Sequence, residues 1–251
     1  MRTFKAYFKK EVIESIRNYK YLVLAIGLLI FAVLDPIMLK MLPDILKSQV
    51  PIDLASLFKV DRAYAVTNYI KDLYQIGLLV VVFTFSGTLG DELWGHKLVF
   101  PYSRGASPRA MVLAKFIHHI LSITILVFIG FILNYYYASV LFSGGDININ
   151  KVLTSAALIS AYYAFSISLL LLFSSLFKKS VFSGILVLII CYLLGTLNFV
   201  DKIKDFSPYI LISSANKFSF DGSIKGLTAT FIISLLFILL TMHRLKKAEV
   251  I

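Results

Sequence analysis

Six apolar runs, each about the length of a membrane-crossing helix, constrain this chain more than any other feature. They cover roughly residues 21–40, 73–90, 114–138, 152–177, 181–200 and 224–242. Of the 251 residues, 59% are hydrophobic and 16% are charged, whereas a soluble domain is about half apolar and about a quarter charged. We therefore expect an all-α integral membrane protein with six transmembrane helices, forming a single membrane domain over residues 1–251.

The basic residues are placed unevenly around these runs. An even number of spans puts both termini on one side of the membrane. The N-terminal stretch, the link after the second run, the turn at Lys178 and Lys179 and the tail all lie on that side, and together they carry most of the net charge of +11. The positive-inside rule then predicts a multi-pass protein of the cell membrane with cytoplasmic termini. Apart from these flanks there is no Lys/Arg patch with interleaved aromatics, so lipid is an expected partner and nucleic acid is not.

The first nineteen residues carry a helical apolar stripe. Its members recur at spacings of three and four, with lysines and arginines mostly elsewhere, and they are Phe4, Tyr7, Phe8, Val12, Ile16 and Tyr19. This pattern is typical of an amphipathic helix in the membrane interface, and we expect one over 1–19. The alternative is a cytosolic helix packed on protein.

A few polar residues within the runs invite a functional reading. Asp35 precedes Pro36 late in the first run, and Tyr162 and Tyr163 lie in the Ser-rich fourth run. Asp35 is either a hydrated residue at a helix kink or a polar group at the mouth of a pathway. The fourth run either packs closely through its small residues or lines a pathway. The three residues are thus possible pathway residues.

Residues 201–223 separate the fifth and sixth runs. The segment is too polar to cross a membrane, too apolar for a free loop, and broken by Pro208. Such a composition predicts a re-entrant segment on the outer side, before the last helix; the alternative is a helix pair that lies on the membrane surface.

The sequence carries no catalytic signature. It has no metalloprotease, serine-hydrolase or phosphate-loop motif, which argues against an enzyme and against a bound cofactor. His118 and His119 are adjacent, and neighbouring side chains project about 100° apart on a helix. We therefore expect no metal site.

Residues 91–115 form a compact mixed-charge segment between the second and third runs. It contains Asp91, Glu92, two prolines and the only tryptophan, Trp94. An ordinary cytoplasmic loop explains the basic residues, but a shaped protein contact better explains the rest, because Trp and Arg are enriched at interfaces. Trp94 is either a headgroup anchor or part of that contact.

This segment resembles the ABC-2-type permeases, the membrane subunits of one class of ABC exporters. The resemblance rests on the order Glu92, Gly95, Leu98, Pro101, Ser103, Arg104 and Lys115. His96 stands where that family usually has Thr, and Ala114 where it usually has Gly. The expected N-terminal interfacial helix, six spans, cytoplasmic termini and re-entrant segment extend the likeness over the whole chain.

The resemblance implies a permease that is not itself catalytic. It would dock on a separate cytosolic ABC ATPase subunit, which binds ATP and magnesium, and pair with a second permease copy as a homodimer or heterodimer. The segment 91–115 would be the cytoplasmic coupling segment. Its ATPase-coupling residues would be Asp91, Glu92, Trp94, Gly95, Pro101, Ser103, Arg104 and Lys115.

The substrate expectation follows from the spans and the family. Spans with few fixed charges favour an amphipathic or lipophilic cargo, and small permeases of the family export peptides and antimicrobials. An exporter of a peptide, toxin or drug, with a role in antimicrobial resistance, is therefore expected. The alternative is a stand-alone membrane enzyme or secondary transporter.

Overall fold

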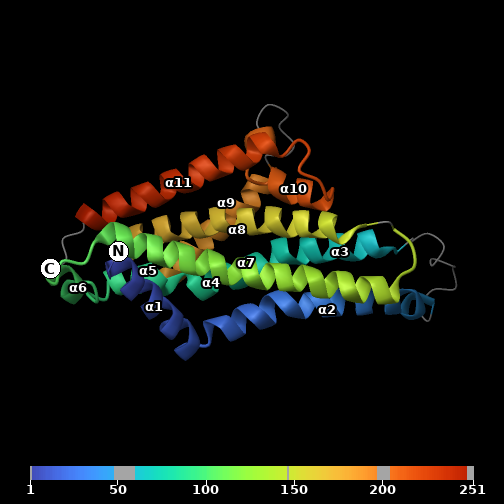
Figure 1. Cartoon of the computed structure of the whole chain (residues 1–251), viewed down its shortest axis with the longest axis horizontal. Coiled ribbons are helices and arrows are strands. Elements are labelled where there is room, and N and C mark those ends of the chain that lie inside the picture. Colours follow the sequence, from blue (N-terminus) through green and yellow to red (C-terminus); the bar gives the residue numbers. More distant parts are fainter. Residues whose placement is uncertain (1, 48–59, 146, 197–203, 248–251) are drawn as a thin grey trace.

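A computed structural model describes residues 2–47, 60–145, 147–196 and 204–247, and every regular element within these ranges is a helix. Long helices run side by side along the molecule (Figure 1). In order of contact they are α2 (Lys20–Lys47), α7 (Pro108–Leu141), α8 (Ile149–Leu176) and α11 (Ile224–Lys247). Their apolar composition and the burial of one face against neighbours explain the bundle.

The second span is longer than its apolar run predicts. It is a nearly continuous helical stretch, Arg62–Leu93, made of α3 (Arg62–Asp72), η2 (Leu73–Gly77), α4 (Leu78–Phe85) and α5 (Gly87–Leu93). Asp61 starts it, because its carboxylate accepts a hydrogen bond from the Tyr64 N–H at 2.8 Å. A hydropathy profile does not detect the first turns, because their buried side chains, which pack against α2 and α7, are interspersed with polar ones.

Five helices within the described ranges are long and apolar enough to cross a membrane. The predicted fifth span, 181–200, corresponds to α9 (Ser180–Thr196), which is apolar but has only 17 residues, or about 25 Å of helix. Residues 197–200 lie outside the described part. The chain is thus an all-helical, multi-pass membrane protein, and six spans stay a prediction.

One end of the bundle gathers the basic flanks. There α1 (Arg2–Arg17) crosses α7, α6 (Val99–Ser103) protrudes, and α11 finishes in Arg244, Lys246 and Lys247 (Figure 1). We call this the basic end. The beginning and the end of the described chain therefore lie at the same end of the bundle.

The segment before the last helix is short and partly helical. Residues 201–203 lie outside the described part, and η4 (Lys204–Phe206) and α10 (Ile210–Asn216) follow. α10 packs on α8, where the Ser155 hydroxyl donates to the Ala215 carbonyl at 2.7 Å. The re-entrant character of 201–223 stays a prediction.

Candidate functional site

The segment 91–115 leaves and re-enters the bundle at the basic end. Between α5 and α7 it forms the single helical turn α6, whose Phe100 is 72% exposed. The Arg104 guanidinium lies 5.5 Å from the Phe100 ring centre, and the Ser103 hydroxyl donates to the Phe100 carbonyl at 2.9 Å. The Pro101 carbonyl accepts hydrogen bonds from the backbone N–H groups of Arg104 and Ala106, and these bonds close the turn. The result is an exposed apolar and cationic knob.

Gly95 sets the direction of this segment. A Cβ atom at Gly95 would lie 2.5 Å from the Asp91 carbonyl oxygen, closer than real Cβ contacts allow. His96, the next residue, has a φ of 55°, a left-handed conformation that side-chain-bearing residues rarely adopt. The turn after α5 therefore depends on glycine at position 95, and Asp91 is left exposed at the helix end.

Lys115 lies at the centre of a buried ion-pair cluster. Its ammonium is 2.5 Å from Glu11 Oε1, 3.0 Å from Glu92 Oε1 and 2.8 Å from the Thr88 carbonyl oxygen, and its side chain is fully buried. Lys10 pairs with the same Glu92 oxygen from the more exposed side. The cluster thus joins α1, α5 and α7 through charges that compensate one another.

Glu92 and Lys115 are consequently interior residues. Their side chains are 8% and 0% exposed, so they shape the segment from within. Several side chains of 91–115 are exposed, among them Asp91, Lys97 and Arg104, and the most exposed apolar one is Phe100 in the knob. The sequence motif holds both kinds of residue without distinguishing them.

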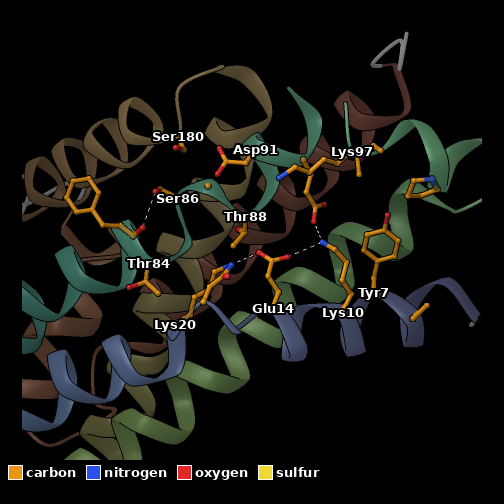
Figure 2. A pocket seen from close by; sticks show the side chains of 17 residues that line it. Tyr7, Lys10, Glu14, Lys20, Thr84, Ser86, Thr88, Asp91, Lys97 and Ser180 are labelled. Atoms are coloured by element: carbon orange, nitrogen blue, oxygen red, sulfur yellow. Dashed lines mark hydrogen bonds and ion pairs between the residues drawn. The ribbon is translucent and has the colours of Figure 1, made fainter. Parts of the chain in front are cut away.

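A polar cavity of about 710 Å³ opens beside this cluster, between α1 and the α4–α5 stretch (Figure 2). Its charged lining side chains are Lys10, Glu14, Lys20, Asp91, Glu92 and Lys97. Glu14 accepts from Lys20 at 2.8 Å and pairs with Lys10 at 3.2 Å. The lining carries both signs of charge in equal number, which does not select a strongly charged ligand.

Burial and neighbouring charges shift the pKa values of ionisable groups on α1 away from their ordinary values. Burial alone would raise the pKa of Glu11, but the adjacent Lys115 ammonium outweighs it and holds that pKa below its ordinary value. Burial, together with the Lys115 charge, lowers the pKa of Lys10. Burial raises the pKa of the Tyr7 hydroxyl to about 12. At neutral pH the Glu11 carboxylate is therefore the charged partner that Lys115 requires.

The packed face of α1 overlaps the predicted stripe at Tyr7 but is rotated away from Ile16. The buried side chains are Tyr7, Glu11 and Ser15, whereas Ile16 is 60% exposed. Of the other stripe residues, Phe4, Phe8 and Val12 are half-buried. α1 therefore packs on protein, as the alternative reading had it, through a face centred on Glu11, while the exposed Ile16 leaves the interfacial prediction open.

Trp94 is half-buried near the turn that follows α8. The Lys178 ammonium lies 5.4 Å from the ring centre, a cation–π contact. Its indole Nε1 is buried without a hydrogen-bond partner among the described residues. The Lys178 contact is internal to this chain, so it belongs to neither of the two predicted roles.

The possible pathway residues lie inside the bundle of a single chain. Asp35 is 6% exposed, and Tyr162 and Tyr163 are each 1% exposed. The Tyr163 hydroxyl donates to the Leu73 carbonyl at 2.7 Å, and the Tyr162 hydroxyl to the Cys191 carbonyl at 3.1 Å. The two tyrosines thus tie α8 to the second span and to α9.

The sequence did not predict the π-helical turn η2, whose Leu73 carbonyl accepts the hydrogen bond from the Tyr163 hydroxyl. A π-helical turn shifts the backbone hydrogen-bond pattern by one residue, so that a backbone carbonyl can accept from a side chain instead. Here the Tyr192 hydroxyl donates to the Gln75 carbonyl at 2.6 Å. No hydropathy or motif signal marks such a turn.

The rings of His118 and His119 lie closer together than helical spacing predicts. Their Nδ1 atoms are 3.1 Å apart and both side chains are buried. The angle between neighbouring Cα–Cβ bonds fixes only where side chains begin, and the rings turn back toward each other through their own torsions. Adjacent histidines can therefore share one ligand.

No protein-family model, curated protein or solved structure matches this chain. The geometry of the basic end, the residue order of 91–115 and the helical architecture are thus what a functional assignment can rest on.

Proposed function

We propose that the chain is the transmembrane permease subunit of an ATP-driven ABC exporter. In this proposal α6 is the coupling element, seated against a separate cytosolic ATPase subunit that binds ATP and magnesium. The chain itself is not catalytic. The basic end faces the cytoplasm of the cell, which follows the positive-inside rule.

The observation that carries the proposal is the construction of the basic end. A short helical turn with an exposed aromatic, Phe100, and a stacked Arg104 protrudes between two spans. The segment that bears it is tied to α1 and α7 by the buried contacts of Glu92 and Lys115. A force applied to α6 would reach both helices through these contacts, because buried ion pairs are stiff and short.

The same segment shares a small apolar core with α1. Tyr7, Leu98, Met111 and Ala114 are buried together, apart from the main core of the bundle. Leu98 immediately precedes α6, and Ala114 lies beside Lys115 on α7. This core gives α6 a second mechanical connection to the membrane helices.

The proposed cargo is an amphipathic or lipophilic molecule such as a peptide, toxin or drug. A groove of about 640 Å³ between α7, α8 and α11 is lined almost wholly by apolar side chains, including Phe116, Phe231 and Met242. Two such subunits, alike or different, would enclose the translocation pathway.

The test is co-purification with a coupled activity. The tagged chain, isolated in mild detergent from its native cells, is expected to bring down an ATPase whose hydrolysis is sensitive to vanadate. Phe100→Ala with Arg104→Ala should uncouple transport from hydrolysis while leaving membrane insertion intact. Phe220→Ala is the matched control, because Phe220 is exposed and lies in the loop between α10 and α11.

Two results would overturn the proposal. One is normal transport by the Phe100 and Arg104 variant. The other is transport or chemical turnover by the purified chain without any ATPase, which would favour a stand-alone secondary transporter or membrane enzyme.

A further inference from the structure

Three potential metal ligands meet where α1 crosses α7. Glu11 comes from α1, and His118 and His119 come from α7. All three side chains are buried, and one carboxylate oxygen and one nitrogen of each ring lie within 4.8 Å of one another. A set of two imidazoles and a carboxylate suits Zn²⁺ and similar divalent transition metals.

The hydrogen bonds of His119 fix its tautomer. The Thr88 hydroxyl donates its single proton to the Phe85 carbonyl at 2.8 Å, so it can only accept from His119 Nε2, 3.2 Å away. His119 Nε2 therefore carries the proton. In the neutral ring, Nδ1 then holds a free lone pair, and it points at His118 Nδ1.

His118 can complete the site by a change of tautomer. Its Nε2 is 2.6 Å from the Tyr21 hydroxyl, which can donate or accept. When the hydroxyl accepts, His118 Nε2 carries the proton and Nδ1 offers a second lone pair facing that of His119. Each ring then donates its Nε2–H to a hydroxyl oxygen while its Nδ1 stays free for a metal, which is the arrangement typical of metal-binding histidines.

Glu11 supplies the third ligand, a carboxylate oxygen. Its Oε1 accepts from Lys115, but Oε2 is buried without a hydrogen-bond partner among the described residues. A buried carboxylate oxygen without a partner is costly. A metal ion beside the two Nδ1 atoms would relieve that cost.

A second acidic group nearby serves as a contrast. Glu11, Glu14 and Glu92 also approach one another, but Lys10 pairs with all three. Glu92 Oε2 also lacks a partner among the described residues, but Lys10 and Lys115 supply cations to this group. The histidine side of Glu11 adds two imidazole nitrogens, which the acidic group does not offer.

We propose that Glu11, His118 and His119 form a binding site for a divalent transition metal ion that fastens α1 to α7. Phe85 stacks on His119 with ring centres 4.0 Å apart, and Phe8 meets His118 edge-on at 5.7 Å. These rings screen the site from water. Three protein ligands leave a fourth position for water or another donor. The inference is independent of the exporter proposal.

The direct test is cobalt titration of the full-length chain in detergent, purified without a histidine tag. One Co²⁺ per chain should bind with the visible absorption of low-symmetry coordination, and Zn²⁺ should displace it. His118→Gln and His119→Gln should each weaken binding roughly ten-fold or more. His243→Gln and His96→Gln are the controls, because these are the other two histidines of the chain and both are exposed.

A measurement on the unaltered chain guards against unfolding of the buried variants. X-ray absorption of the Zn²⁺-loaded protein should show two imidazole ligands. Failure of the folded chain to bind Co²⁺ or Zn²⁺, a zinc shell without imidazole, or equal binding by folded His118→Gln and His119→Gln variants would overturn the proposal and leave the histidines as a hydrogen-bonded pair.

Discussion

The basic end and the middle of the bundle bury polar atoms in opposite ways. At the basic end, Lys115, Glu11 and Glu92 are buried as charges that neutralise one another. Around η2, tyrosine hydroxyls donate to backbone carbonyls, as Tyr163 does to Leu73. Removing one charged side chain leaves its partners as uncompensated charges in the protein interior. Removing one hydroxyl leaves only a single neutral acceptor without its donor. The two regions should therefore respond very differently to equally small changes.

The largest effect is expected at Lys115. Lys115→Met leaves Glu11 and Glu92 without their central cation, and we expect a loss of about 3–5 kcal/mol in the free energy of unfolding. Titration with SDS in mixed micelles measures it. Lys97→Met is the matched control, since Lys97 is an exposed lysine of the same segment.

A double variant sharpens this prediction. Lys115→Met combined with Glu11→Gln removes one charge of each sign, so its loss should be clearly smaller than the sum of the two single losses. Strict additivity would mean that the two side chains do not depend on each other, against the account of the cluster.

A smaller effect is expected in the tyrosine region. Tyr163→Phe removes one buried hydrogen bond and leaves the Leu73 carbonyl with one fewer donor, which should cost about 1–2 kcal/mol. Tyr136→Phe, at a tyrosine that is 62% exposed, should be nearly neutral. A Tyr163→Phe loss as large as that of Lys115→Met would remove the distinction between the regions.

Acid should weaken the basic end. Burial by itself would raise the pKa of Glu14, but the hydrogen bond from Lys20 and the nearby lysine charges outweigh it and lower the pKa below its ordinary value of 4.5. A lowered pKa in the folded state contributes stability that is present above pH 4.5 and is lost as the pH falls further. The thermal midpoint should thus fall below this pH, and less steeply in Glu14→Gln. Equal slopes for both proteins would contradict the assignment.

The smallest effect on stability is expected at the knob. Phe100 is largely exposed, so Phe100→Ala should change the free energy of unfolding by no more than about 0.5 kcal/mol. Thermal unfolding of the purified chain checks this. A large loss would mean that Phe100 belongs to the fold rather than to a contact surface.

Much of the helical layout could be predicted from hydropathy, because span length and lipid exposure are written into composition. The runs 152–177 and 224–242 correspond closely to α8 and α11. The start of the second span at Arg62 could not, since its buried residues are interspersed with polar ones and contacts with α2, α7 and α10 make them interior. Its π-helical turn η2 accepts hydrogen bonds from tyrosines of α8 and α9, and no local sequence pattern reveals such contacts.

The role of the segment from Glu92 to Lys115 stays a prediction, but the structure shows what the residue order could not reveal. Burial separates Glu92 and Lys115 from the exposed Phe100, which the motif does not include. Glu11 escaped notice because it is a charged residue at the edge of an apolar stripe, and the stripe alone directs attention to its apolar members. The approach of His118 and His119 depends on side-chain torsions, which spacing does not determine.

Cross-linking from α6 tests the central claim most directly. The single native cysteine, Cys191, is buried, so Phe100→Cys introduces one exposed thiol, and Phe220→Cys introduces another far from it as a control. With a short thiol-reactive cross-linker, Phe100→Cys is expected to join the co-purified ATPase and Phe220→Cys is not. Equal cross-linking from both positions, or none from position 100 in an assembled complex, would contradict the account.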